Sequence, residues 1–179
     1  SFAQQRLWFI EQLEPGTAAF ALTETLRLGG EPDTAALGRA LDEVVRRHEA
    51  LRTVFGHSAD GPGEVVRAAP PGVLPVWELP GPGPGAEAEL RRLADAEVLR
   101  PFDLERGPLF RATQLGAAPD DALLLLSMHH AVSDGWSMGV LKRELSALSA
   151  AFAGGEPSPL PELPFQYGDY AAWQRAWLR

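Results

Sequence analysis

Residues 128–137, with the sequence MHHAVSDGWS, form the densest group of polar side chains in an otherwise apolar part of the chain. They follow a run of leucines at 123–126, which is typical of a strand buried on both faces. Imidazole exchanges protons near neutral pH, and His130 is placed where such a strand ends. This position suits assistance to an amine or alcohol that attacks an acyl group.

Asp134 lies four residues beyond His130, in a segment that the sequence predicts to be a turn. Its carboxylate can orient the imidazole, or it can turn away and pair with an arginine. Capping and ion pairing are common roles for an aspartate in a tight turn. The pair of residue types therefore leaves both roles open.

The elements that must position this segment follow from the spacing of apolar residues. Alternation of apolar and polar residues predicts strands, and apolar residues three or four apart predict helices. Strands are expected at 19–28, 51–55, 64–68, 73–78, 109–115 and 121–129. Helices are expected at 4–13, from a cap at Asp33 to His48, at 86–99, from a cap at Ser137 to Phe152, and over 167–177. Glycine- and proline-rich segments at 80–85 and 116–120 predict a loop and a turn between strands.

This order of elements predicts an α/β protein, built as a two-layer sandwich in which helices cover a mixed β-sheet. A chain of 179 residues with 45% hydrophobic content is long enough to bury one core, so a single domain is expected. The strand at 121–129 should lie at the centre of the sheet. His130 is then placed at a strand-to-helix junction.

Composition excludes several classes of function. The formal charge of -8 is spread along the chain without a block of Lys or Arg, which argues against binding to nucleic acid or an anionic membrane. The chain has no cysteine, so it cannot form a disulfide or a thiolate metal site. No apolar run is long enough to span a bilayer, and the first residues lack the layout of a signal peptide. A soluble, cytoplasmic protein is expected, and both ends of the sequence suggest a piece of a longer one.

Two other catalytic classes lack their residues. No Gly-x-Ser-x-Gly elbow precedes a helix, as a serine hydrolase of the α/β type requires. The adjacent pair His129 and His130 does not have the spacing of a metal-ligand set, so no metal site is expected.

Four segments, in this order, resemble the motifs of condensation domains from nonribosomal peptide synthetases. They are SFAQQRLWFI at 1–10, RHEALRTVF at 47–55, MHHAVSDGWS at 128–137 and YGDYAAW at 167–173. The third segment matches the His-His-x-x-x-Asp-Gly signature of the family. The resemblance covers nearly the whole chain but only the N-terminal part of the family's motifs. Residues 1–179 are therefore expected to be an N-terminal subdomain without its C-terminal subdomain.

The departures from the family motifs are mild. Ile10 stands where leucine is usual, Val132 where isoleucine is usual, and Ala172 where valine is usual. Each changes only the volume of an apolar contact. None involves a residue with proposed chemistry.

The resemblance implies a lobe similar to half of chloramphenicol acetyltransferase, with the active site in a tunnel between this lobe and a second one. It implies formation of an amide bond between a donor acyl or peptidyl thioester and an aminoacyl acceptor. Both are carried by phosphopantetheine arms on peptidyl carrier protein domains, and no cofactor binds this chain directly. The implied partners are those carrier domains, the C-terminal subdomain and a neighbouring adenylation domain. The isolated chain should be inactive because half of the tunnel is absent.

The resemblance also assigns roles to single residues. His130 corresponds to the active-site histidine, as a general base or as a positioning group, and His129 supports it. Asp134 corresponds to an aspartate that pairs with an arginine. Arg52 and Arg6 are candidate partners, and an arginine in the absent lobe is the alternative.

Other residues of the motif are assigned to packing and backbone geometry. Gly135 leaves room for the carrier arm or supplies a positive φ. Trp136 is expected to pack, and Ser137 to cap the following helix. His48, on an apolar helix face, is expected to be a hydrogen-bonded core residue. The aromatic side chains at 167–177 are expected to cover the core or the absent lobe's interface, and to form an exposed apolar patch without that lobe.

Two alternatives to this function differ in class. An acyltransferase of the same superfold that uses coenzyme A thioesters would share His-x-x-x-Asp-Gly, but the segments at 1–10 and 47–55 argue against it. A non-catalytic lobe that binds carrier proteins or tailoring enzymes would resemble a condensation domain with a degraded histidine motif. The intact motif at 128–137 favours condensation, and its details most resemble the type that joins two L-residues.

Overall fold

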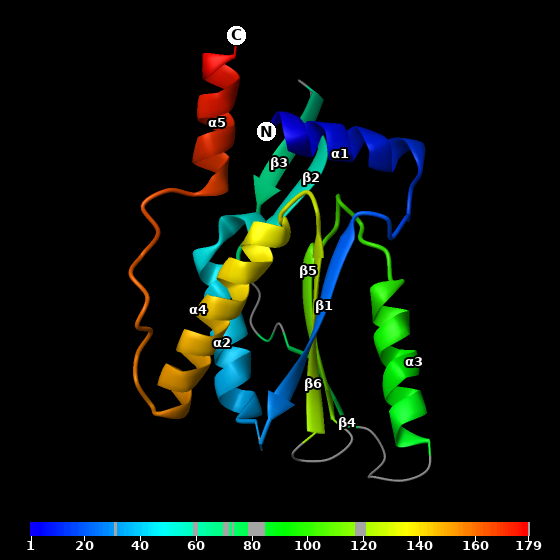
Figure 1. The fold of residues 1–179 in the computed structure, drawn as a ribbon. Helices are drawn as coiled ribbons and strands as arrows, with labels where there is room; N and C mark the ends of the chain where they lie inside the picture. Colours follow the sequence, from blue (N-terminus) through cyan, green and yellow to red (C-terminus); the bar gives the residue numbers. More distant parts are fainter. Residues whose placement is uncertain are drawn as a thin grey trace.

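The computed structural model describes residues 1–30, 32–58, 61–69, 72, 74–78, 85–116 and 121–178. Most of the predicted loop, at 80–84, and most of the predicted turn, at 117–120, therefore fall outside the described residues. The helices and strands follow one another along the chain as shown in Figure 1. They are α1 (Phe2–Leu13), β1 (Ala21–Gly29), α2 (Thr34–Arg47), the short 3-10 helix η1 (Glu49–Arg52), β2 (Thr53–Ser58), β3 (Gly61–Val66), β4 (Val76–Glu78), α3 (Ala86–Val98), β5 (Phe110–Gly116), β6 (Asp121–His129), α4 (Gly135–Ala153) and α5 (Tyr167–Trp177).

The main sheet is mixed and has the strand order β1-β6-β5-β4. Strand β6 pairs antiparallel with β1 on one side and with β5 on the other, and β4 adds parallel to β5. Strands β2 and β3 form a separate antiparallel pair. Strand β6, which leads into His130, is therefore an inner strand of the sheet, as the leucine run predicts.

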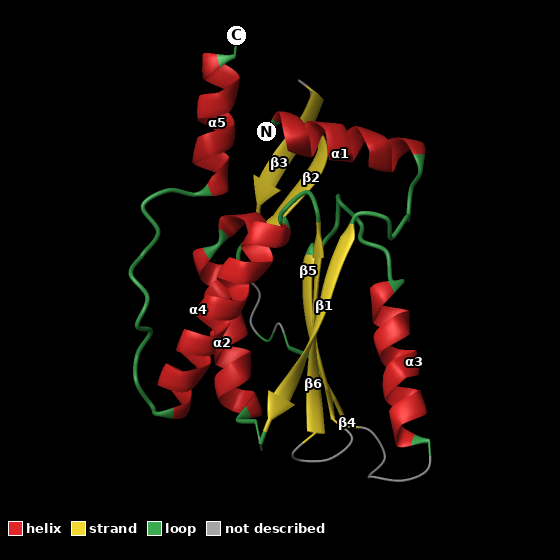
Figure 2. Ribbon diagram, viewed as in Figure 1, coloured by secondary structure: helices red, strands yellow, loops and turns green. Residues whose placement is uncertain are grey.

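Helices cover both faces of this sheet, as Figure 2 shows, with α2 and α4 on one side and α3 on the other. Side chains of β6 alternate between the two layers. Leu124 and Leu126 pack with α2 and α4, whereas Leu125 packs with Leu90 of α3. The predicted mixed sheet covered by helices is confirmed. Helix α3 adds a third layer to the two that the sequence predicts, because both faces of β6 are apolar.

Helix α2 begins and packs as its sequence predicts. The Asp33 carboxylate accepts a hydrogen bond from the Ala36 backbone N–H at 2.8 Å, which caps the first turn. The predicted apolar face is buried in the core and comprises Leu37, Leu41, Val44 and Val45. His48 differs from its prediction as a core residue. It ends α2, its side chain is 25% exposed, and its Nε2 lies 2.7 Å from Oε2 of Glu144.

Arg47 and His48 join α2 to α4 and to the connector, residues 154–166, that leads into α5. The Arg47 side chain is buried, lies 3.4 Å from the Glu144 carboxylate, and donates to the Pro161 carbonyl at 2.8 Å. Gln166 donates to the Arg47 carbonyl at 2.9 Å, just before α5 begins. The segment at 47–55 thus fixes where the connector docks.

We expect Glu144→Ala to lower the free energy of unfolding by about 3 kcal/mol, because it removes the carboxylate that faces the buried Arg47. Glu43→Ala is the matched control, since its arginine partner, Arg46, is half exposed. The control should cost less than about 1 kcal/mol. Urea unfolding of both variants measures the difference, and equal losses would contradict this role of Glu144.

Helix α5 carries a ladder of aromatic rings that is exposed in this chain. Its members are Tyr167, Tyr170, Trp173 and Trp177, whose neighbouring ring centroids lie 5.5, 6.0 and 5.7 Å apart. Trp177 is 69% exposed. The predicted exposed apolar patch is confirmed. No helix among the described residues has the length and apolar content needed to cross a bilayer.

Candidate active site

His130 follows β6 and lies on the wall of a cleft of about 350 Å³. Its backbone N–H donates to the Phe20 carbonyl at 2.8 Å, which continues the pairing of β1 with β6. Its side chain is exposed, and no hydrogen bond to its ring occurs among the described residues. The backbone of His130 is therefore fixed, while the ring nitrogen atoms are available to form hydrogen bonds with a bound molecule.

His129 points into the protein instead. Its side chain is 1% exposed and lies between the rings of Phe20 and Phe102, with centroids 6.2 and 5.9 Å away. Its Nδ1 accepts a hydrogen bond from the Ala131 backbone N–H at 3.0 Å. Burial lowers the pKa of His129 to about 4, and the neighbouring His130 acts in the same direction. His129 is therefore neutral at pH 7 and carries its proton on Nε2, which has no partner among the described residues.

The turn after His129 is held by hydrogen bonds to that residue's own backbone. The His129 carbonyl accepts from the Val132 N–H and from the Ser133 hydroxyl, both at 3.0 Å. Together with the bond from Ala131 to the imidazole, these contacts fix the backbone on both sides of His130. The exposed catalytic candidate is therefore carried by a rigid turn.

Asp134 caps α4. One carboxylate oxygen, Oδ1, accepts from the Ser137 backbone N–H at 2.8 Å and from the Ser137 hydroxyl at 2.7 Å. These hydrogen bonds hold the pKa of Asp134 below its usual value. The prediction that Ser137 is the cap is wrong, because the aspartate three residues earlier takes that position and Ser137 is the donor.

The two candidate arginines lie in different places. Arg52 donates to the Glu49 carboxylate at 3.2 Å and to the Arg67 carbonyl at 2.7 Å, so the structure does not bring it to Asp134. Arg6 lines the same cleft as His130 and Asp134, without a hydrogen bond to either among the described residues. Of the candidate partners of Asp134, Arg52 is therefore excluded, and Arg6 contributes a positive charge to the cleft. Pairing with an arginine of the C-terminal subdomain stays a prediction.

Trp136 departs from its expectation, and one of the two roles expected of Gly135, a positive φ, is excluded. Gly135 is the first residue of α4 and does not have a positive φ. A Cβ added to it would meet no atom within 4 Å, so nothing in the described chain excludes a side chain there. Trp136 is 80% exposed and does not pack as predicted. Both residues lie in the first turn of α4 and are exposed at the surface of this chain.

Sequence reasoning missed three residues that build the cleft. Phe20 supplies the carbonyl that binds the His130 backbone, Ser133 holds the turn, and Tyr167 brings α5 to the cleft wall. The Tyr167 hydroxyl lies 3.0 Å from the Ser1 hydroxyl. Phe20 could have been found only from the register of β1 on β6. The serine at position 133 lies inside the motif, but its partner is a backbone atom that no spacing reveals.

We expect Asp134→Ala to lower the free energy of unfolding by about 1 kcal/mol, the usual cost of losing an N-cap. This is less than the roughly 3–5 kcal/mol that loss of a buried ion pair costs. Asp134→Ser, which keeps an oxygen to accept from the Ser137 N–H, should restore most of the loss. Chemical denaturation of both variants measures this. A loss above about 3 kcal/mol in the alanine variant would contradict a capping role.

Comparison with known proteins supports the interpretation of the sequence motifs. The family model described as Condensation domain matches residues 1–179. The chain is 46% identical over 175 residues to chondramide synthase cmdD of Chondromyces crocatus, which covers 97% of this chain and 4% of that protein. It is 44% identical over 179 residues to phosphinothricin tripeptide synthetase PhsC of Streptomyces viridochromogenes, covering 99% of this chain and 16% of that protein. The chain thus spans a small part of these curated relatives.

Solved structures share the fold. The starter condensation domain of rhizomide synthetase RzmA superposes with a TM-score of 0.89 at 22% identity, over 99% of this chain and 43% of that one. The X-domain in its complex with OxyB from teicoplanin biosynthesis superposes with a TM-score of 0.88 at 30% identity, over 98% of this chain and 37% of that one. The first of these likenesses concerns the fold alone. Since the family model matches the chain throughout, the chain belongs to the condensation domain family of nonribosomal peptide synthetases and represents its N-terminal portion.

Proposed function

We propose that this chain supplies the N-terminal lobe of a domain that forms a peptide bond between two carrier-bound thioesters. The observation that carries the proposal is the His130 imidazole, exposed on a cleft wall and free of hydrogen bonds within the described chain. The donor is an acyl or peptidyl thioester and the acceptor an aminoacyl thioester. The amine of the acceptor attacks the donor carbonyl, the amide forms, and the donor thiol leaves.

His130 serves this reaction by holding the acceptor amine and by accepting its proton. General base catalysis contributes about 10²–10⁴-fold, and alignment of two tethered reactants contributes a larger share. His129 supports this role because it fixes the turn through Ala131 while remaining neutral. A cation at position 129 would instead repel the charge that develops on His130.

The partners follow from the need for two tethered substrates. Peptidyl carrier protein domains deliver the donor and the acceptor on phosphopantetheine, and an adenylation domain neighbours the lobe. No cofactor belongs to this chain itself. The C-terminal subdomain completes the tunnel over His130, and the exposed Trp136 and the aromatic ladder of α5 offer apolar surface for it. Open space around the Cα of Gly135 suits the approach of a carrier arm.

The donor and acceptor are both L-residues in this proposal, as the details of residues 128–137 suggest. The test is peptide formation by the full parent protein with both carrier domains loaded. An L-aminoacyl donor should give the dipeptidyl thioester, and the D-donor should react about 10²-fold more slowly, because its carbonyl is misplaced relative to the amine. Equal rates would contradict the stereochemical assignment without affecting peptide formation itself.

The likeness to the X-domain bound to OxyB favours a second candidate, a lobe that binds another protein without catalysing condensation. The same assay separates the two functions. Absence of product with either donor, from a parent whose carriers are fully loaded, would support the second candidate. Product from the L-donor would exclude it.

A further inference from the structure

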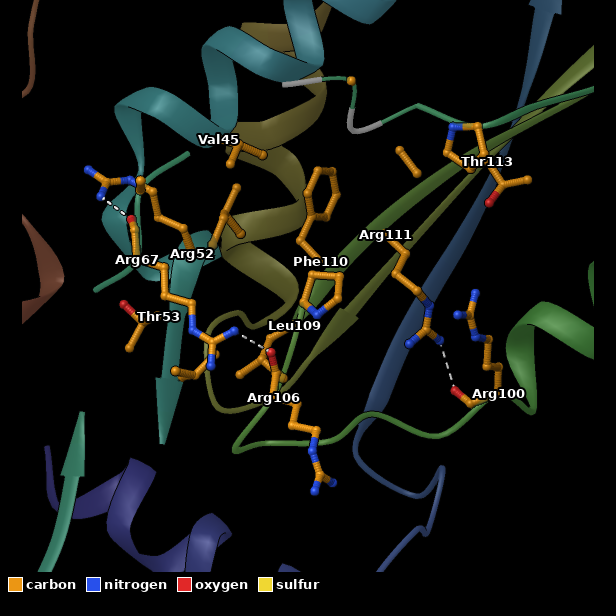
Figure 3. A pocket seen from close by; sticks show the side chains of 17 residues that line it. Val45, Arg52, Thr53, Arg67, Arg100, Arg106, Leu109, Phe110, Arg111 and Thr113 are labelled. Carbon is orange, nitrogen blue, oxygen red and sulfur yellow. Dashed lines mark hydrogen bonds between the residues drawn. The ribbon is translucent and has the colours of Figure 1, made fainter. Parts of the chain in front are cut away.

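A second cavity, of about 490 Å³, is larger than the cleft of His130 and shares no lining residue with it. It lies between β2 and β5, as the close view in Figure 3 shows. Its volume falls in the range of small-molecule sites, which is about 300–1,000 Å³. The cavity takes no part in the proposed function.

The cavity combines an apolar floor with a cationic rim. Buried apolar side chains form the floor, and they include Val45, Leu51, Val54, Leu109 and Phe110. Every charged residue among the described lining residues is an arginine, and these are Arg52, Arg67, Arg100, Arg106 and Arg111. The chain as a whole has a formal charge of -8, so this concentration of positive charge contrasts with the rest of the molecule.

Two of these arginines are held in place by carbonyl groups on one side of the cavity. Arg67 donates to the carbonyls of Arg106 at 2.7 Å and Glu105 at 3.1 Å, and it has no carboxylate partner among the described ion pairs. Arg52 donates to the Arg67 carbonyl and to the Glu49 carboxylate at 3.2 Å, while its Nε is buried and has no partner among the described residues. Arg106 also pairs with a carboxylate, that of Asp103, at 3.0 Å. The positive charge that this side of the cavity retains is therefore that of Arg67, and Arg52 keeps one unused donor.

The opposite side of the cavity also has fewer carboxylates than arginines. Arg111 and Arg100 share one carboxylate, that of Glu97, at 2.5 and 3.5 Å. Arg111 also stacks on the Phe102 ring, with its guanidinium carbon 3.7 Å from the ring centroid, and donates to the carbonyl of Arg100. Figure 3 shows these two arginines across the cavity from Arg52 and Arg67. Glu97 offsets one of the two positive charges, and the carbonyl groups and the ring fix the arginines without neutralising the other charge.

We propose that this cavity binds a small organic anion, with its carboxylate or phosphate group near Arg52 and Arg67 and its apolar body on the floor formed by Val54, Leu109 and Phe110. Guanidinium groups bind both kinds of anion through paired hydrogen bonds, and prior fixation of the arginines reduces the entropy lost on binding. The anion binds independently of the condensation reaction, because the cavity and the His130 cleft have separate walls.

The test is ligand-observed fluorine NMR on the full parent protein. The probes are para-trifluoromethylbenzoate, para-trifluoromethylbenzyl phosphate and, as the neutral counterpart, para-trifluoromethylbenzyl alcohol. At least one anion should bind at least about tenfold more tightly than the alcohol, since a hydrogen bond to a charged group is lost in the alcohol. The ratio between the two anions identifies the preferred head group. Equal binding of all three probes would overturn the proposal.

Two variants place the binding in this cavity. Arg67→Ala removes the charge, and Ala68→Trp fills the rim at an exposed position while leaving all the arginines in place. Both should weaken binding of the anion at least about tenfold. Arg92→Ala is the control, because Arg92 is an exposed arginine on α3 outside the cavity. Anion binding that is unchanged in Ala68→Trp would overturn the proposal even if Arg67→Ala perturbed the fold.

Discussion

Replacement of His130 by alanine is expected to lower the rate of peptide formation by the full parent protein about 10²–10⁴-fold. The side chain is exposed and makes no hydrogen bond within the described chain, whereas the backbone N–H that binds the Phe20 carbonyl survives the change. The thermal melting temperature should therefore stay unchanged. A large loss of rate without a loss of stability is the signature of a group that acts on the substrate.

The measurement compares product formation by the wild-type parent, His130→Ala and His130→Gln, with both carriers loaded to the same extent. Glutamine keeps a hydrogen-bonding side chain but does not exchange a proton near neutral pH, so it separates positioning from base catalysis. Full loss in both variants supports proton transfer, and partial recovery in the glutamine variant supports positioning. His48→Ala is the control histidine, because it lies at the end of α2 against Glu144. Unchanged product formation in His130→Ala would contradict a site role for this residue.

The parts of the fold that the sequence predicts are those set by local periodicity. The leucine run at 123–126 predicts an inner strand because it is apolar on both faces. In the structure, β6 packs against α2 and α4 on one face and against α3 on the other. Asp33 is predicted as a cap because its carboxylate acts only three residues away. The position of His130 follows in the same way, since it needs only the end of β6 and the start of a turn.

The parts that could not be predicted depend on contacts between distant residues. The apolar helix face around His48 suggests a buried side chain. The structure instead has a half-buried ring whose Nε2 lies 2.7 Å from Glu144, a residue 96 positions away in the sequence. Asp134 and Ser137 are both capping residues, and their spacing allows either to be the cap. The backbone of α4 decides in favour of Asp134, which begins the helix earlier than predicted. Trp136 is predicted to pack, yet its side chain stays largely exposed in this chain.

His129 should make the stability of this chain sensitive to mild acid. Its pKa is about 4 in the folded chain because the ring is buried, whereas an exposed histidine has a pKa near 6.5. Below pH 6.5 the unfolded chain therefore binds a proton that the folded chain does not. The contribution of neutral His129 to the free energy of unfolding is fully present above pH 6.5. It decreases as the pH falls toward 4, by roughly 3 kcal/mol over that range.

His129→Asn tests this origin of the pH dependence, because asparagine places a carbonyl oxygen where Nδ1 accepts from the Ala131 N–H and does not titrate. The variant should be less stable than wild type at pH 7, by about 1–2 kcal/mol for the space left by the smaller side chain. Between pH 6.5 and 4 it should lose about 3 kcal/mol less than wild type. Urea unfolding at several pH values measures both slopes, with His130→Asn as the control for an exposed neighbouring histidine. Parallel pH profiles for His129→Asn and wild type would show that the buried imidazole is not the group that titrates.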